Sequence, residues 1–256
     1  YKINTTIGKQ SVSNSIAQAI DDLTKAEQLL SDVYPSNEKV RINKSVVEGF
    51  LARMYLYQNN WEMAQHYAKK LINNSTFKIE PVTTVFVKES TSAIWQLKPE
   101  VEGKNTLEAV EYQYESLPPP FVRLGTNLIN AFEKGDLRKE HWVKFIGTDS
   151  LNASAFKYKK KGLTSPSQEY SIILRLEEMY LIAAEASAVK GEWHEFNTYI
   201  NVIRSRAGLS MLNITEYQEA IQALKQERRV EFFCEFGHRF YDLKRWNLLN
   251  EMMQVK

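Results

Sequence analysis

The chain of 256 residues is 43% hydrophobic and 12% aromatic, enough to bury a sizeable core as one large domain or two packed lobes. Its 33 basic and 31 acidic residues leave a net charge of +2, which argues against a nucleic-acid-binding protein whose affinity rests on neutralising phosphates. No apolar run approaches the roughly 20 residues that a transmembrane helix needs. The single cysteine, Cys234, excludes an internal disulfide and a thiolate metal cluster.

Residues 1–76 carry three amphipathic helical patterns and form the first predicted helical repeat region. Apolar residues step by three or four from Val12 to Val33. A second helix follows the capping residue Asn43 and contains the small Gly49, which would let a neighbouring segment approach closely. A third helix begins at Trp61 after a short polar turn. Two helices joined by so tight a turn predict an αα-hairpin.

Between residues 77 and 168 the helical period fades, which predicts an inserted lobe of mixed structure. Short β-branched or alternating runs, typical of strands, occur at "TVFV" (84–87), "AIWQL" (93–97) and "VEYQY" (110–114). The prolines at 118–120 predict a rigid, extended connector. "TNLINAFEKGD" then predicts a helix that ends at Gly135, and "FKYKKKG" (156–162) predicts a solvated strand edge.

Residues 169–256 predict the second helical repeat region. An apolar stripe from Ile173 onward predicts a helix that ends near Gly191, and a partner helix runs from Trp193 to a cap at Gly208. Thr215 and Gln218 fit a capping box that opens a third helix. Gly237 interrupts the pattern, which restarts in "HRFYDLKRW".

The two predicted hairpins are similar to each other. Trp61 aligns with Trp193 and Tyr67 with Tyr199, in a pattern that resembles tetratricopeptide repeats. Such units bury their apolar faces by stacking on one another. We therefore predict a mostly α fold: a tetratricopeptide-like superhelix of αα-hairpins with an inserted smaller lobe that contains short strands.

Five short strings follow one another between Arg175 and Trp246: "RLEEMYLIAAEA", "KGEW", "IRSRAGL", "ERRVEF" and "GHRFYDLKRW". In this order and at these intervals they resemble the C-terminal signature of the SusD/RagB family. That family comprises cell-surface nutrient-binding lipoproteins of Bacteroidetes that hand glycans to a TonB-dependent outer-membrane transporter. Compared with its members, the chain looks like a fragment that lacks the usual N-terminal and extreme C-terminal segments.

The resemblance implies a non-catalytic protein of the outer membrane and cell surface that binds a glycan or another nutrient. Its implied partners are an oligosaccharide and a SusC-like TonB-dependent transporter, with no nucleic acid and no cofactor. Contact with the membrane would come only through an N-terminal lipid anchor, which this chain does not contain. A helical-repeat scaffold that binds proteins without direct glycan binding is the alternative interpretation.

A sugar site needs exposed aromatic rings beside polar side chains that form directional hydrogen bonds. In the family, these residues come from the lobe outside the repeats. The lobe here offers aromatic and polar candidates at Tyr112, Tyr114, Trp142 and Tyr158, with Asn105, Asn127 and Arg123. For each aromatic residue, burial in the small core of the lobe is the competing interpretation.

Local motifs for catalysis or metal binding are absent from the sequence. The four histidines are far apart and form no HxH or HxxxH pair, and there is no GxSxG, GxxxxGK[ST] or GxGxxG motif. The charged signature residues are expected to lock helices together, with Arg175 paired to Glu177 or Glu185 and Arg228 paired to Glu231 or Asp242. Cys234 is expected to be a buried, inert thiol on an apolar helix face.

Overall fold

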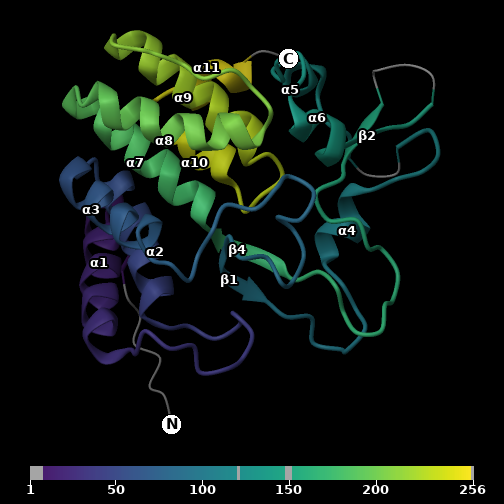
Figure 1. Ribbon diagram of the computed structural model, residues 1–256, viewed down its shortest axis with the longest axis horizontal. Helices are drawn as coiled ribbons and strands as arrows, with labels where there is room; N and C mark the ends of the chain where they lie inside the picture. The colour runs from purple at the N-terminus through teal and green to yellow at the C-terminus, as the bar shows by residue number, and fades with distance from the viewer. Residues whose placement is uncertain (1–7, 120–121, 148–151, 255–256) are drawn as a thin grey trace.

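The computed structural model describes residues 8–119, 122–147 and 152–254. Most of the longer helices gather on one side of the molecule, and the short strands and short helices form a lobe on the other (Figure 1). The predicted mostly helical fold with few short strands is confirmed. The helical side contains α1 (Val12–Leu29), α2 (Lys44–Tyr57), α3 (Trp61–Ile72), α7 (Leu176–Lys190), α8 (Trp193–Arg206) and α9 (Tyr217–Glu231).

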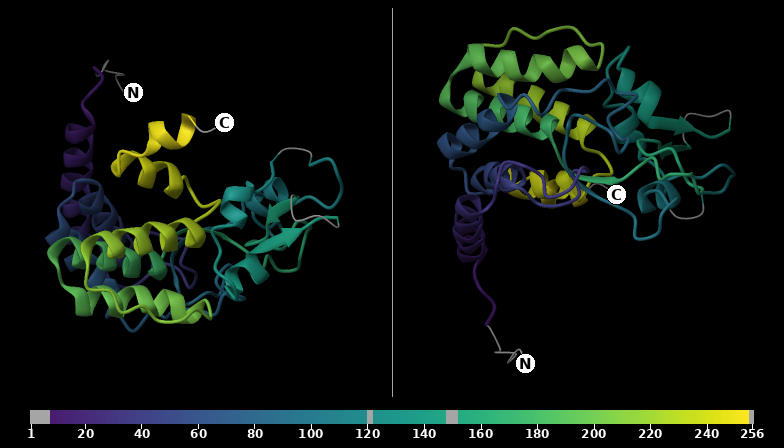
Figure 2. Two further views of the ribbon diagram at one scale, coloured as in Figure 1. Left: turned by 90° about the horizontal axis from the view of Figure 1, so that it is seen from above. Right: turned by 60° about the horizontal axis from the view of Figure 1, so that its bottom comes forward.

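The lobe consists of short elements. Its helices are α4 (Leu107–Tyr112), α5 (Thr126–Ile129) and α6 (Leu137–Trp142), and its strands are β1 (Ala93–Leu97), β2 (Val143–Phe145), β3 (Ala153–Ala155) and β4 (Ser171–Arg175). The chain ends in α10 (His238–Arg245) and α11 (Leu249–Gln254), which stand between α1 and the lobe when the molecule is seen from above (Figure 2).

The two predicted hairpins are present as α2–α3 and α7–α8, and α3 packs against α7 (Figure 1). The α7 helix is buried on nearly all sides, because its neighbours are α3, α8 and α9. The approach expected at Gly49 is confirmed: a Cβ atom there would lie only 2.2 Å from Cδ2 of Leu174 on β4. Only glycine therefore fits against β4 at this turn of α2 without a shift of Leu174.

Two antiparallel strand pairs connect distant parts of the sequence. β1 pairs with β4, so that Gln96 faces Ile172, and β2 pairs with β3, so that Val143 faces Ala155. The start of the helix predicted from Ile173 is therefore wrong, since residues 171–175 form a strand and the helix begins only at Leu176. A short apolar run is compatible with either a helix or a strand, and here the pairing with β1 stabilises the strand.

Several other local predictions are wrong because tertiary contacts outweigh short patterns. Residues 110–112 belong to a helix, α4, whose N-terminus is capped by the Thr106 hydroxyl. Residues 84–87 form turns with Val85 and Phe86 buried, and the strand expected at 156–162 lies instead at β3. The helix expected to end at Gly135 already ends at Ile129.

The helix caps give a mixed result. The expected cap at Asn43 is confirmed, because its side chain accepts a hydrogen bond from the Val46 amide. The capping box at Thr215 is wrong, since α9 begins at Tyr217 after Glu216 without a side-chain cap. The predicted proline connector falls partly outside the described residues, at Pro120. Among the described helices, none is both long enough and apolar enough to span a bilayer.

Candidate functional site

A buried network of ion pairs joins the lobe to the helices. Arg175, at the junction of β4 and α7, contacts three carboxylates: Nη1 lies 2.6 Å from Glu231 and 3.2 Å from Glu177, and Nε lies 2.9 Å from Glu235. Arg138 of α6 reaches Glu231 from the other side at 2.9 Å. The predicted pairing of Arg175 with Glu177 is confirmed, and the network joins β4, α6, α7 and α9.

A second group of ion pairs fixes α10 to the helices. Arg228 on α9 donates from Nε to Asp242 at 2.8 Å, which confirms that predicted pair. Arg245 bridges Asp242, at 2.9 Å, and Glu185 on α7. All four side chains are nearly inaccessible to solvent. These charges therefore hold helices in place and are not available to a ligand.

The arginines keep the central carboxylate of the network ionised. Burial alone would raise the pKa of Glu231, but the positive charges of Arg206 and Arg175 outweigh burial, so that its pKa lies well below its ordinary value. Burial likewise opposes ionisation of Glu235, and Arg175 and Lys157 again lower its pKa overall. Such carboxylates stabilise the fold only while they are ionised.

We expect the free energy of unfolding to decrease as the pH falls below about 4.5. The pKa of Glu231 and that of Glu235 are lower in the folded state than in the unfolded state, so the unfolded state takes up protons first. Urea denaturation between about pH 7 and pH 3 measures this effect. Glu231→Gln should be less stable at neutral pH and should show a shallower loss in acid. An equally steep acid loss in that variant would contradict this role.

Three adjoining depressions meet at Tyr112, the last residue of α4; together they are called the Tyr112 site. The first, of about 260 Å³, lies against the α9–α10 connection and is lined by Glu108, Phe236, His238 and Arg239, among others. The second, of about 180 Å³, is lined by Arg123 and Cys234. The third, of about 360 Å³, is lined by Leu107, Glu111 and Phe236.

Both aromatic and charged side chains line the Tyr112 site. The Tyr112 ring is half-buried, and Phe236 beside it is 46% exposed. Glu108 accepts a hydrogen bond from the Ser171 hydroxyl at 2.8 Å, which fixes the position of its carboxylate. The site therefore combines apolar ring faces with charged groups of both signs.

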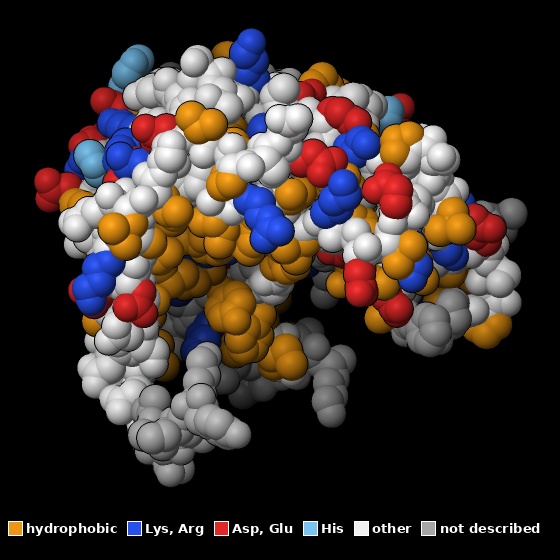
Figure 3. Space-filling model, turned by 90° about the horizontal axis from the view of Figure 1, so that it is seen from below, with side chains coloured by type: hydrophobic (Ala, Val, Ile, Leu, Met, Phe, Trp, Pro, Cys, Tyr) orange, Lys and Arg blue, Asp and Glu red, His pale blue; other side chains and the backbone are white. Residues whose placement is uncertain are grey.

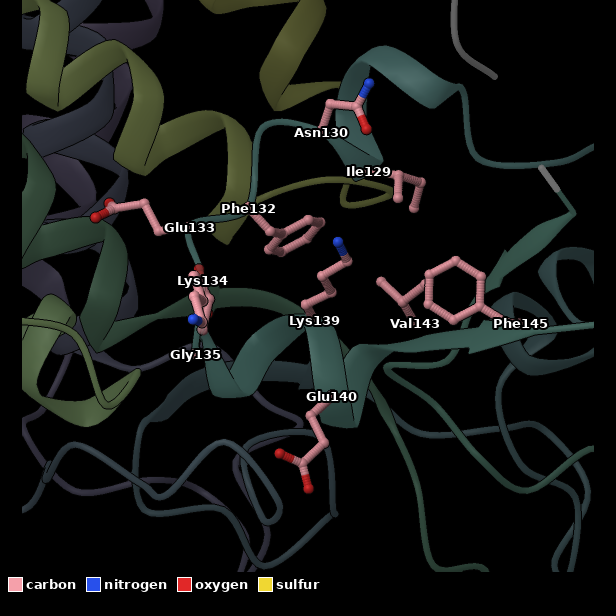
Figure 4. A pocket seen from close by; sticks show the side chains of 11 residues that line it. Ile129, Asn130, Phe132, Glu133, Lys134, Gly135, Lys139, Glu140, Val143 and Phe145 are labelled. Atoms are coloured by element: carbon pink, nitrogen blue, oxygen red, sulfur yellow. The ribbon is translucent and has the colours of Figure 1, made fainter. Parts of the chain in front are cut away.

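A second hollow, of about 830 Å³, lies on the far part of the lobe between α5, α6 and β2. Figure 4 shows Phe132, Val143 and Phe145 around it, with the Lys139 side chain extended among them. Glu133 points away from the hollow in this view, and it is paired with Arg204 at 2.6 Å. This groove is of mixed character, because Asn130, Lys134 and Glu140 also line it.

Three of the predicted sugar-contacting aromatics are in the interior, which corrects their assignment as surface platforms. Trp142 is 0% exposed, donates from Nε1 to the Val82 carbonyl at 2.6 Å and packs edge-on against Phe86. Tyr158 is buried and accepts a hydrogen bond from the Ile172 amide, and Tyr114 is buried as well. The lobe is small, so it needs these large rings to form its own core.

The polar residues that the sequence suggested as sugar contacts do not lie together in one site. Asn105 joins two loops, since its side chain donates to the Gly162 carbonyl and accepts from the amides of Gln168 and Glu169. Asn127 is exposed and does not line the Tyr112 site. Of the predicted set, only Tyr112 and Arg123 line one depression together.

Cys234 does not lie on a helix as expected; it lies in the connection between α9 and α10 with a positive φ of 56°. Burial raises the pKa of its thiol to about 11, so the thiol is protonated at neutral pH. Three further residues line the Tyr112 site although the sequence did not predict them as ligand contacts: Phe236, His238 and Arg239. All three fall in or beside the "GHRFYDLKRW" string, which had been assigned only to helix locking.

Comparison with known proteins shows what the chain is similar to. Residues 141–256 match the model of the SusD family, over the stretch that carries β2 to α11 and most of the buried ion pairs. The C-terminal part of the chain thus matches the SusD family. Among curated proteins, the family member "SusD-like protein P25" from Formosa agariphila is 22% identical over 97% of the chain, and "SusD-like protein P38" from the same organism is 29% identical over 55% of the chain.

Solved structures share the fold of this chain. A SusD superfamily protein from Bacteroides vulgatus superposes with a TM-score of 0.81 at 24% identity, covering 96% of this chain. The surface glycan-binding protein A from Bacteroides uniformis gives a TM-score of 0.78 at 22% identity, also over 96% of this chain. The chain spans 58% of the length of the P25 protein and 60% of each of these two structures.

Proposed function

We propose that this chain is a glycan-binding, non-catalytic part of a cell-surface nutrient-uptake protein, and that the glycan lies at the Tyr112 site. Relatives of the same fold carry the descriptions "surface glycan-binding protein A" and "SusD-like carbohydrate binding protein". The observation that carries the proposal is that Tyr112 borders all three depressions, with Phe236 and charged groups around it.

The chemistry of the Tyr112 site suits a sugar. A pyranose ring presents an apolar C–H face, which packs against an aromatic ring, and a rim of hydroxyls, which need directional partners. Tyr112 and Phe236 supply ring faces, while Arg123 and Glu108 supply a donor group and an acceptor group at the rim. In the larger groove beside Lys139, Phe145 is exposed but Phe132 is buried.

The charge network supports a role without catalysis. Acid–base hydrolysis of a glycan needs two carboxyl groups that reach the scissile bond. Glu177, Glu227 and Glu231 are buried and held by arginines, so they do not reach a bound sugar. Within the described ranges, no group of three or more His, Cys, Asp or Glu side chains is placed to hold a metal ion.

In this proposal, the full protein is lipid-anchored at the outer membrane and passes its glycan to a SusC-like TonB-dependent transporter. The helical side would dock on the transporter and leave the lobe open to the ligand. A purely protein-binding scaffold is the second candidate, and one observation favours it. Seen from below, the molecule is hollowed between α1 and the lobe, and hydrophobic side chains gather in the hollow (Figure 3).

Isothermal titration against a panel of oligosaccharides tests the proposal. We expect Tyr112→Ala to weaken binding about tenfold or more, because the ring stacking is lost, which corresponds to about 1.4 kcal/mol. Tyr217→Ala is the matched control, since Tyr217 is 45% exposed and lies at the opposite end of α9 from the Tyr112 site. Failure of every oligosaccharide to bind would support the scaffold, and equal losses in both variants would contradict the site.

A further inference from the structure

The N-terminus of α10 opens into the first depression of the Tyr112 site, which Gly237, His238 and Arg239 help to line. No side chain caps this end of the helix. The His238 amide donates to the Glu235 carbonyl at 3.0 Å, whereas none of the described residues accepts from the next two amides, those of Arg239 and Phe240. Free amides and the helix dipole make such an end favourable for an anion.

Arg239, which lines the depression, and Arg229, whose charge acts on that of Arg239, lack ion-pair partners among the described residues. Arg229 and Arg239 form no ion pair with any residue that the structure describes, unlike Arg228 and Arg245 on the same two helices. Burial lowers the pKa of both groups, and the positive charge of Arg229 lowers the pKa of Arg239 further. The charge of Asp242 offsets only part of this for Arg239, and a bound anion would relieve the remaining repulsion between the two half-buried like charges.

His238 is the second feature that indicates a ligand. It is 5% exposed, stacks on Phe232 and lines the same depression, yet its Nδ1 has no hydrogen-bond partner among the described residues. Buried polar atoms without partners are uncommon in folded proteins. Burial and the charges of Arg53 and Arg228 keep the imidazole neutral by lowering its pKa well below the ordinary value.

Negative groups around the depression are few or already paired. Glu235 is neutralised by Arg175 at 2.9 Å and by Lys157 at 2.5 Å. Asp242 is held between Arg228 and Arg245. Glu108 remains, at the side of Tyr112, and its carboxylate is bonded to the Ser171 hydroxyl. The Arg239 guanidinium and the N-terminus of α10, with the Arg229 charge nearby, therefore outweigh one carboxylate.

We propose that the start of α10, together with Arg239 and His238, binds an oxyanion carried by the glycan: the carboxylate of a uronic acid or a sulfate ester. This inference rests on the proposed function and narrows it to acidic glycans. A sugar ring packed on Tyr112 places a substituent within the same depression as Arg239, because both residues line it. Arg239 would then provide a bidentate donor pair, the arrangement that arginine offers to carboxylate and sulfate oxygens.

The test compares acidic oligosaccharides with their neutral counterparts by isothermal titration of the full chain. One arm uses oligogalacturonate and its methyl ester, and the other uses a sulfated oligosaccharide and its desulfated form. We expect the acidic member of at least one pair to bind about tenfold more tightly. Arg239→Gln should abolish this preference. Lys244→Gln, which removes an exposed positive charge from the same helix, should keep it.

The outcomes separate the inference from the proposed function. Binding of neutral and acidic sugars with equal affinity would overturn the acidic-glycan inference and leave the Tyr112 site standing. An acidic preference that survives in Arg239→Gln would overturn it as well. If no sugar binds, inorganic sulfate tests the anion site by itself. It should shift the NMR signals of His238 in the parent chain and leave them unshifted in Arg239→Gln. Unshifted signals in the parent would overturn the anion site.

Discussion

Replacing Arg175 with methionine should lower the free energy of unfolding by about 3–5 kcal/mol, because it leaves buried carboxylates without their counter-charge. Arg175 is 2% exposed and is shared by Glu177, Glu231 and Glu235. Urea denaturation followed by circular dichroism measures the change. Lys25→Met is the matched control, since Lys25 pairs with Asp21 on the surface of α1, and its unfolding midpoint should stay near that of the parent.

A second substitution shows whether uncompensated charge causes the loss. Glu235→Gln in the Arg175→Met background removes one of the orphaned carboxylates, so the double variant should recover part of the lost stability. Failure of the single variant to fold agrees with the prediction, provided that the double variant folds. A loss in Arg175→Met no larger than in Lys25→Met would show that the network does not hold β4 and α7 together.

Trp142→Ala should cost about 3–5 kcal/mol, as expected for a large aromatic residue that is removed from a well-packed core. The ring is fully buried, packs on Phe86 and lies below the Lys157 ammonium, whose nitrogen is 4.8 Å from the ring centroid. Its Nε1 donor would be lost, which leaves the Val82 carbonyl without that hydrogen bond. Thermal and urea denaturation both report the effect.

Phe145→Ala is the control for Trp142→Ala. Phe145 follows Trp142 in the next strand and is 40% exposed, so its removal should cost less than about 1 kcal/mol. Similar losses in the two variants would mean that Trp142 is not the centre of the lobe's core. If Trp142→Ala keeps its stability but loses glycan binding, Trp142 contacts the ligand, as the sequence suggested.

The long helices could be predicted from the sequence because their signals are local. Apolar stripes with turns at "QNN" and "KGEW" placed both hairpins, and Gly191 and Gly208 adopt the left-handed conformation expected after a helix. The short elements could not be predicted in this way. Residues 171–175 and 110–114 have similar apolar runs, yet the first pairs with a distant strand and the second begins inside a capped helix.

The ligand site could be predicted only in part, because its residues are brought together by tertiary contacts. An aromatic residue in a small lobe serves either its core or its surface, and the sequence does not tell Trp142, which is buried, from Tyr112, which borders a depression. Arg228 and Arg229 are adjacent in the chain, but only the folded structure shows that Asp242 pairs with the first of them. Which charges hold helices and which face a ligand thus depends on tertiary contacts.

The central claim is that a glycan lies at the Tyr112 site, and a crystal structure of the protein with a bound oligosaccharide tests it most directly. The account predicts a sugar ring packed against Tyr112 or Phe236, with its hydroxyls within hydrogen-bond distance of Arg123 or Glu108. A sugar in the groove beside Lys139 and Phe145, or in the hollow between α1 and the lobe, would contradict the claim.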